Sequence, residues 1–436
     1  MAETDTTLRS FVEIPPDSDF GIHNLPFGVF RPRALARPRV GVAIGGQVLD
    51  LSVLVERGLF RGPEMRDTWV FHEPSLNAFL SMGRPAWREA RQRIAELLSA
   101  DEPALRDDAG LRDAALLPAA SVQLLLPARI GDYTDFYSSR EHATNLGTMF
   151  RGPANALQPN WLHLPVGYHG RSSSIVVSGT DIRRPSGQFR PDGADLPAYG
   201  PSRMMDFELE VGFLVGPGSE LGVPVPLDRA AEHIFGLVLV NDWSARDIQQ
   251  WEYVPLGPFL GKNFATSISP WVVTLEALEP FRCAGPAQAD PAPLPYLSSS
   301  GDCAFDISLE VLLQSAAMAE PARVASANYA SLYWNMCQQL AHHTVNGCNL
   351  RPGDLMASGT ISGTGRHERG SLLELAWRGA EPLTLPTGET RSFLADGDTV
   401  IMRGRCERDG LRLGFGEVRG TLLPALEPWE RVGIGP

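Results

Sequence analysis

The 436-residue sequence is short of cations. Its 38 lysines and arginines face 51 aspartates and glutamates, which gives a formal net charge of -13. Proteins that bind nucleic acid need clustered cations to displace counterions from the phosphate backbone, so we expect no nucleic-acid partner. With 43% hydrophobic and 20% charged residues, the composition is typical of a folded protein with a sizeable core.

Long hydrophobic runs and closely spaced cysteines are also missing. Apolar runs such as Ile234 to Val240 fall far short of the ~20 residues that span a bilayer, and the start MAETDTTLRS has acids where a secretory signal carries cations. The five cysteines are odd in number and form no Cys-x-x-Cys pair, which argues against a disulfide framework and against a cysteine metal site. We expect a protein of the reducing cytoplasm with no membrane span.

Glycine and proline, by contrast, are frequent, at 43 and 36 residues, and favour short strands joined by turns. Alternating residues 39–44 and 47–51 flank Gly45-Gly46 and predict a hairpin. Residues 75–98 have helical spacing that is interrupted near Gly83-Arg84-Pro85, and residues 100–121 read as a connector. We place a domain boundary near residue 125, between an N-terminal unit of residues 1–125 and a C-terminal unit of residues 126–436.

The C-terminal unit reads as a large mixed β structure. One helix is predicted over residues 327–343, where apolar residues step by three and four before Asn346-Gly347. The segments predicted as strands are residues 173–177, 207–210, 234–240, 271–275, 305–313 and 400–403.

Three acids alternate with apolar residues in the segment Asp206-Phe207-Glu208-Leu209-Glu210. On a strand, Asp206, Glu208 and Glu210 project from one face. Neighbours on that face lie ~7 Å apart, so each like-charged pair costs about 2.4 kcal/mol at an effective dielectric constant of ~20 unless a cation is near. A strand that faces water explains the same pattern without any site, because water screens the repulsion.

Another candidate acid, Asp242, follows the apolar strand 234–240. Ser244 and Asp247 have the spacing of a capping box, so a short helix should begin there and hold Asp242 at a strand-to-helix corner. A carboxylate held rigidly in this way is well placed to bind a ligand, although an Asp in a turn more often accepts hydrogen bonds from backbone N–H groups.

Two further segments carry polar side chains. Residues 131–142 place two acids, two tyrosines, an arginine and His142 close together; a histidine is the usual general base near pH 7, and Asp135 offers oxygen to a hard cation. Lys262 follows a glycine turn that fails the phosphate-loop pattern, so it reads as a point charge. A surface loop and a solvated lysine are the plainer alternatives.

Taken together, these segments resemble the fumarylacetoacetate hydrolase family over almost the whole chain. The resemblance rests on residues 17–20, 24–26, 131–143, 159–170, 241–262 and 345–354. It implies a mainly β fold, with a small N-terminal SH3-like β-barrel domain followed by a large C-terminal mixed β-roll domain. It also implies a homodimer and a small-molecule substrate, 4-fumarylacetoacetate, whose carbon-carbon bond is hydrolysed to fumarate and acetoacetate in the last step of tyrosine and phenylalanine catabolism.

The resemblance also assigns site residues. It implies that a divalent metal, Mg²⁺ and/or Ca²⁺, is the cofactor, and that a second group of positions is associated with a further metal or with the leaving-group region. Oxygen donors suit either cation. The implied metal ligands are Asp135, Glu208, Glu210 and Asp242, and the associated positions are Lys262 and Thr266; Asp206 is not among them, so a solvent-facing Asp206 stays the expectation.

The implied catalytic residues are His142, Glu374, Arg246, Gln249 and Lys262. His142 would act as general base, with Glu374 fixing its tautomer. Arg246 and Gln249 would stabilise an oxyanion, and Lys262 the leaving group. The implied substrate contacts are Tyr137, Arg151, Tyr168, Gln249, Tyr253 and Thr360.

Other functions stay open at this point. The same fold supports other metal-dependent reactions of oxo-acids, so a related acylpyruvate hydrolase or decarboxylase is one alternative. The other is a non-catalytic β-rich module that uses Ca²⁺ for its structure. The set of His142, Glu374, Arg246 and Gln249 favours hydrolysis, because a decarboxylase needs no pair of residues that activates water.

Overall fold

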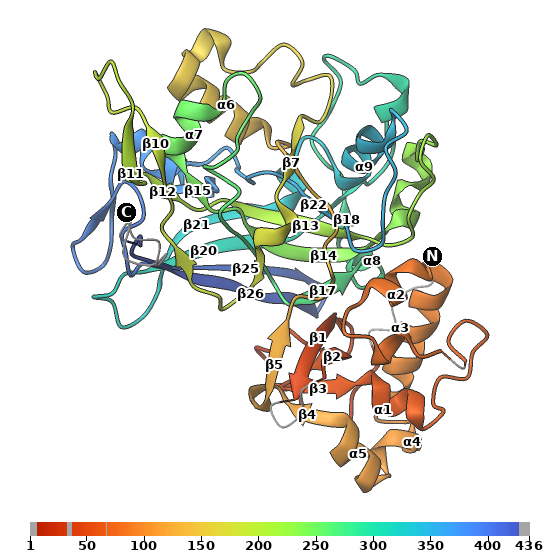
Figure 1. Cartoon of the computed structure of the whole chain (residues 1–436). Helices are drawn as coiled ribbons and strands as arrows, with labels where there is room; N and C mark the ends of the chain where they lie inside the picture. Colours follow the sequence, from red (N-terminus) through yellow and green to blue (C-terminus); the bar gives the residue numbers. More distant parts are fainter. Residues whose placement is uncertain (1–6, 33–36, 67, 427–436) are drawn as a thin grey trace, which may run out of the picture.

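The computed structural model describes residues 7–32, 37–66 and 68–426. Residues 1–6, which hold both acids read above as unlike a secretory signal, lie outside this range. Two large sheets dominate the described chain, and the N-terminal elements, red to orange, gather at one end (Figure 1). The fold is mainly β, as predicted. No helix of the described residues is long and apolar enough to cross a membrane.

The larger sheet has 13 strands and joins strands of the N-terminal unit to strands of the C-terminal unit. Its main path, in spatial order, is β4 (Leu116–Pro118), β3 (Gln47–Asp50), β2 (Arg39–Ile44), β1 (Phe27–Pro32), β17 (Trp271–Thr274), β14 (Ile234–Asn241), β13 (Leu209–Val215), β22 (Leu355–Ala357), β6 (Tyr133–Phe136) and β7 (Gly167–Gly170). Three strands branch from this path: β5 (Val122–Leu125), β16 (Thr266–Ile268) and β8 (Ile175–Val177).

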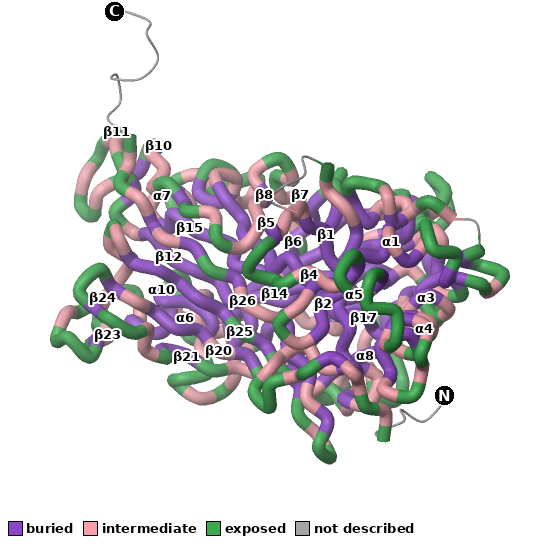
Figure 2. The backbone as a smooth tube through the Cα atoms, turned by 90° about the horizontal axis from the view of Figure 1, so that it is seen from below, coloured by how far each residue is buried: buried purple, intermediate pink, exposed green. Residues whose placement is uncertain are grey.

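A second sheet of five strands lies against the larger one. Its order is β21 (Ala322–Asn328), β20 (Ser308–Gln314), β25 (Thr399–Arg408), β26 (Leu411–Leu423) and β9 (Ile182–Arg183). Gly404 on β25 marks how closely the sheets approach, because a Cβ atom there would lie 2.9 Å from Leu239 on β14. The buried side chains between the sheets form the main core, and Figure 2 shows these central strands as buried.

Short two-stranded ribbons and helices complete the fold. The ribbons are β10 (Ser186–Phe189) with β11 (Ala198–Pro201), β12 (Met205–Asp206) with β15 (Ser244–Ala245), β18 (Arg282–Cys283) with β19 (Ala304–Phe305), and β23 (Leu383–Thr384) with β24 (Thr390–Arg391). The α-helices are α1 (Leu51–Glu56), α2 (Asn77–Ser81), α3 (Arg84–Leu98), α4 (Pro103–Arg106), α5 (Ala109–Ala115), α6 (Arg140–Arg151), α7 (Arg246–Glu252), α8 (Leu275–Leu278), α9 (Met336–Thr344) and α10 (Leu372–Leu375).

The predictions for the N-terminal unit are largely confirmed. Strands β2 and β3 form the expected hairpin, and α2 and α3 flank Gly83, whose φ of 81° suits glycine. The connector prediction for residues 100–121 missed two short helices, α4 and α5, which Glu102 and Asp108 cap. Strand β1 pairs with β17, so these strands extend an open sheet, and no closed barrel is found among the described residues.

The helix predicted over residues 327–343 was wrong in its first half. Residues up to Asn328 belong to β21, and α9 begins only at Met336. Asn335 starts the helix, because its side chain accepts a hydrogen bond from the Gln338 amide while Gln338 reaches back to the Asn335 amide. The amide of Tyr333 donates to the Ser138 carbonyl, so a tertiary contact, which spacing cannot reveal, sets this segment's path.

Candidate active site

Four buried carboxylates meet where the strands of the larger sheet end. Asp135 lies on β6 and Glu210 on β13, while Glu208 precedes β13 and Asp242 follows β14. The β13–β14 register brings the last two together, and the Asp242 amide donates to the Glu208 carbonyl. Strand β22 lies between β13 and β6 and sets Asp135 beside them. One oxygen from each carboxylate lies within 4.8 Å of the others.

This carboxylate cluster lacks enough positive charge of its own. Burial and the neighbouring carboxylates raise the pKa of Asp135 and of Glu210 well above the ordinary range. Asp135 Oδ1 and both Glu210 carboxylate oxygens are buried without a hydrogen-bond partner among the described residues. Buried oxygen donors that repel one another and lack partners fit a hard divalent cation.

Lys262 compensates one side of the cluster. Its ammonium is buried and pairs with Glu208 and, at 2.6 Å, with Asp242. Burial opposes ionisation of Glu208, but Lys262 and Arg246 outweigh it and hold the pKa of Glu208 below its ordinary value. The two carboxylates likewise outweigh burial at Lys262 and raise its pKa, so Lys262 stays charged. Thr266 donates to Asp242 Oδ1 at 2.7 Å.

Arg246 and Gln249 begin the helix that follows Asp242. Arg246 makes an ion pair with Glu208 at 2.7 Å, and its Nη1 donates to Gln249 Oε1 at 3.1 Å. The predicted capping box was wrong. Ser244 instead donates to the Asp242 carbonyl, and Asp247 accepts from Ser202 Oγ and the Arg203 amide. These contacts outside the helix take both side chains away from the cap.

The expectation of a solvent-facing Asp206 was also wrong. Its side chain is fully buried and accepts a hydrogen bond from Arg246 Nε at 2.8 Å. The alternation did not persist as one strand, because β12 ends at Asp206 and β13 begins at Leu209. Asp206 therefore lies behind Arg246, whereas Glu208 and Glu210 belong to the carboxylate cluster.

His142 and Glu374 form a buried pair. His142 lies in the first turn of α6, where Ser139 caps the helix, and its Nδ1 lies 2.6 Å from Glu374 Oε2. Burial opposes ionisation of Glu374, yet contact with His142 outweighs it and lowers the pKa of that carboxyl. Since Glu374 holds Nδ1, the other ring nitrogen, Nε2, is left to exchange protons.

Sequence reasoning missed the side chains that hold Glu374. Asn145 Nδ2, Ser362 Oγ and Ser371 Oγ all donate to its carboxylate, at 2.8, 3.0 and 2.9 Å. Two of them left a signal: Asn145 stands three residues after His142 on one helix, and Ser371 has capping-box spacing to Glu374. Ser362 left none, because only the fold brings its loop to α10.

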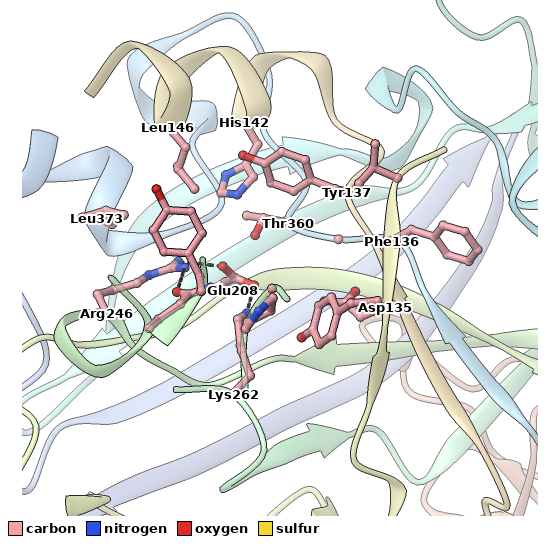
Figure 3. A pocket seen from close by; sticks show the side chains of 18 of the residues that line it. Asp135, Phe136, Tyr137, His142, Leu146, Glu208, Arg246, Lys262, Thr360 and Leu373 are labelled. Atoms are coloured by element: carbon pink, nitrogen blue, oxygen red, sulfur yellow. Dashed lines mark hydrogen bonds and ion pairs between the residues drawn. The ribbon is translucent and has the colours of Figure 1, made fainter. Parts of the chain in front are cut away.

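The His142–Glu374 pair and the carboxylate cluster meet at one cavity of about 390 Å³ (Figure 3). The pair reaches it through His142, and the cluster through Asp135 and Glu208. In the figure, His142 and Leu146 reach the cavity from the helix on one side, and Arg246, Glu208 and Lys262 reach it from the other. Four of the predicted residues are not in the cavity lining: Glu210, Asp242, Thr266 and Glu374. Glu374 contacts His142, Asp242 contacts Lys262, and Thr266 contacts Asp242, while Glu210 belongs to the carboxylate cluster. The predicted residues in the lining are Asp135, Tyr137, His142, Arg151, Tyr168, Glu208, Arg246, Gln249, Tyr253, Lys262 and Thr360.

The polar side chains in the cavity lining differ in how far their hydrogen bonds are already satisfied. Thr360 Oγ1 is buried without a hydrogen-bond partner among the described residues. Tyr168 donates to Asp242 Oδ2 at 3.1 Å, so it lies at the edge of the carboxylate cluster. Arg151 ends α6, where Nε and Nη2 donate to the carbonyls of Asn155 and Ala156. Half-exposed Tyr253 lies at the rim.

Comparison with known proteins identifies the family. Residues 132–422 match the family described as fumarylacetoacetate (FAA) hydrolase C-terminal, and residues 23–127 match fumarylacetoacetase N-terminal. The chain is 59% identical to a fumarylacetoacetase of Bos taurus, over 96% of this chain and 99% of that protein, and 58% identical to that of Homo sapiens, over 96% and 100%.

Solved structures agree in fold. A fumarylacetoacetate hydrolase from Exiguobacterium antarcticum superposes with a TM-score of 0.52 at 18% identity, covering 92% of this chain and 99% of that one. The match in sequence extends over most of the chain and includes the segments that carry the cavity. The chain belongs to the fumarylacetoacetate hydrolase family.

Proposed function

We propose that the protein hydrolyses a carbon-carbon bond of 4-fumarylacetoacetate, giving fumarate and acetoacetate, as the last step of tyrosine and phenylalanine catabolism. One observation carries the proposal: a His142–Glu374 pair and a buried carboxylate cluster border the same cavity. Relatives that are 53 to 59% identical bear the name fumarylacetoacetase, which supports the choice of substrate. The enzyme is thus a hydrolase that acts on carbon-carbon bonds in ketonic substances.

His142 starts the reaction by taking a proton from water at Nε2, while Glu374 holds Nδ1 and stabilises the imidazolium. The hydroxide adds to the carbonyl beside the bond to be broken. Arg246 and Gln249 donate to the resulting oxyanion; such donors typically supply about 3 kcal/mol each. When this intermediate collapses, the fumaroyl carbon becomes a carboxylate and the bonding electrons leave with the acetoacetate carbon, which then takes up a proton.

The leaving group departs as an enolate, and we assign the stabilisation of its charge to the carboxylate cluster. Asp135, Glu208, Glu210 and Asp242 would hold Mg²⁺ or Ca²⁺, whose positive charge, when bound, stabilises the enolate oxygens. Lys262 adds a second positive charge and a proton source. Thr266 orients Asp242 through its 2.7 Å hydrogen bond.

The remaining cavity residues suit substrate binding. Four residues with hydroxyl groups line the cavity: Tyr137, Tyr168, Tyr253 and Thr360. Gln249 borders the cavity beside Arg246. Arg151 is the cation at the end of α6, and we assign it to a terminal carboxylate of the substrate, which a guanidinium binds through paired hydrogen bonds.

We further propose that residues 1–125 form an SH3-like domain and residues 126–436 a catalytic β-roll, and that the chain works as a cytoplasmic homodimer. The two family matches, which end at 127 and begin at 132, support the division. All five cysteines are free, which suits a reducing compartment. The homodimer rests on the family resemblance.

The proposed reaction has a direct test. The purified protein should consume the conjugated-diketone absorbance of fumarylacetoacetate and yield fumarate and acetoacetate in equal amounts. Chelation should abolish turnover, and Mg²⁺ or Ca²⁺ should restore it. If the folded, metal-loaded protein leaves the substrate intact, a related acylpyruvate hydrolase or decarboxylase becomes the better assignment.

Metal binding should also release protons. Because burial and mutual repulsion raise the pKa values of Asp135 and Glu210, these groups hold protons that a bound cation displaces. Titration calorimetry of Mg²⁺ in two buffers of different ionisation enthalpy should reveal this release at a pH where the raised pKa values keep these groups partly protonated, and the affinity should fall as the pH is lowered. Identical heats in the two buffers would show that the acids are already ionised.

A further inference from the structure

Asp206 is a fully buried carboxylate to which the proposed mechanism gives no role. It does not line the cavity, yet both of its oxygens have partners. Oδ2 accepts from Arg246 Nε at 2.8 Å and from the Leu373 amide at 3.2 Å. Oδ1 accepts from the Leu372 amide at 2.8 Å and from its neighbour, the Phe207 amide, at 2.9 Å. Its partners therefore come from α7, from α10 and from its own segment.

The first contact fixes the guanidinium of Arg246. Asp206 holds Nε from behind, Glu208 pairs with Nη2 and Gln249 accepts from Nη1. Glu208 belongs to the carboxylate cluster and Gln249 borders the cavity, so in the proposed mechanism each is shared with the metal or the substrate. Asp206 is the partner that contacts neither. Because its hydrogen bond is charge-assisted, it is the strongest fixed anchor for the orientation of Arg246.

The second contact fixes the turn that carries Glu374. Leu372 and Leu373 donate their amides to Asp206, and Glu374 is the next residue of α10. Across this turn, Glu374 Oε2 meets His142 Nδ1 at 2.6 Å. One carboxylate thus anchors both the oxyanion donor and the partner of the general base.

We propose that Asp206 is a positioning residue for the reaction, which sets the direction of Arg246 and the place of the Glu374 turn relative to each other. This inference rests on the proposed function for its kinetic consequences. Asparagine in its place offers one acceptor oxygen and no charge where four N–H groups now find two charged oxygens. After this substitution, Arg246 and the turn that carries Glu374 stay beside the cavity but lose the carboxylate that holds both of them.

The chain offers a matched control in Asp398, which is also buried and pairs with an arginine. Arg391 donates to it through Nε at 2.8 Å and Nη2 at 3.0 Å, and the Ala395 amide donates at 2.8 Å. Neither residue lines the cavity. Asp398→Asn therefore repeats the chemical change and the loss of a buried ion pair away from the catalytic groups.

The kinetic test compares Asp206→Asn with Asp398→Asn in the full-length, metal-loaded enzyme. We expect kcat for fumarylacetoacetate to fall about 30-fold or more in Asp206→Asn, with KM and Mg²⁺ affinity changed less than about twofold, because transition-state contacts alone are lost. Asp398→Asn should lower the thermal midpoint and leave kcat near that of the wild type. A wild-type kcat in folded Asp206→Asn, or an equal kcat loss in both variants, would overturn the proposal.

A double-mutant cycle with Arg246→Lys separates positioning from general destabilisation. Asp206 acts through Arg246, so its replacement in the Arg246→Lys background should lower kcat less than in the wild type, by about threefold or less. Full additivity of the two losses would rule out the Arg246 route.

Hydrogen exchange tests the anchor without any substrate, so it still decides the matter if the wild type does not cleave fumarylacetoacetate. In the wild type, the Arg246 Nε–H and the amides of Leu372 and Leu373 should exchange as slowly as those of strand β14. Asp206→Asn should speed their exchange, and Asp398→Asn should not. Fast exchange in the wild type would refute the anchor, and this measurement remains available if Asp206→Asn fails to fold.

Discussion

Replacing His142 by alanine is expected to lower kcat by about a thousandfold, the range typical for loss of a general base. The side chain contacts Glu374 and borders the cavity. Among the described residues it makes no hydrogen bond or ion pair with the four acids of the carboxylate cluster. Mg²⁺ affinity should therefore persist. Turnover and a metal titration on the same preparation measure both quantities.

His233→Ala is the control for this change. His233 is partly buried and its Nδ1 lies 2.8 Å from the Pro217 carbonyl, outside the cavity lining. It should keep its turnover. If His142→Ala turned over as fast as the wild type, His142 would have no part in the reaction, and a module that binds Ca²⁺ for structure alone would gain support.

Neutralising the carboxylate cluster should separate stability from activity. Asp135→Asn and Glu210→Gln each remove a buried carboxyl group whose ionised form has no cation of its own. At a pH where these groups ionise, the metal-free variants should therefore unfold at a higher temperature than the metal-free wild type. At a separation of 4.8 Å and an effective dielectric constant of ~20, one like-charged pair costs about 3.5 kcal/mol if both members are ionised. The same variants should bind Mg²⁺ poorly and lose most of their turnover.

The pH dependence of metal-free stability is an independent test of whether these carboxyl groups destabilise the fold. The pKa values of Asp135 and Glu210 are raised in the folded protein above their ordinary values of 3.8 and 4.5. The folded state therefore holds protons that the unfolded chain releases, and metal-free stability should fall as the pH rises from about 4 towards the raised pKa values. Each substitution should flatten this fall, which thermal unfolding with chelator present can follow.

Asp50→Asn supplies the opposite control. Asp50 is fully buried, but Arg39 pairs with it at 2.5 Å and the Ser52 amide donates to it at the start of α1. Removing a satisfied carboxylate should destabilise the protein. If Asp135→Asn also destabilised the metal-free protein, the acids would be satisfied without a cation and the metal site would lose its main physical support.

The sequence contains the local features of this protein. Alternation and turn residues were enough to predict the hairpin β2–β3, the strand β14 and the interruption between α2 and α3, because each depends on neighbours in the chain. Asp242 at the end of an apolar strand was visible in the same way. The resemblance to a family then gathered distant acids into one proposed site.

Long-range contacts overruled local pattern at several positions. Residues 327–335 step like a helix, but strand pairing and the contact with Ser138 hold them in other conformations. Asp206 alternates with Glu208 and Glu210, yet it faces Arg246 and α10 because the strand breaks between it and Leu209. Ser362 reaches Glu374 from a loop that no spacing connects to it.

The sequence by itself determined which residues could do chemistry and where several strands and turns lie, because these depend on residue type and short spacing. Only the tertiary structure decided which acids meet in one buried cluster, which one contacts Arg246 and which histidine meets a carboxylate. Asp135, Glu210 and Asp242 become neighbours through the register of β6, β22, β13 and β14. Two of these pairings, β6 with β22 and β22 with β13, join residues more than a hundred positions apart, and a period of two along one strand does not specify them.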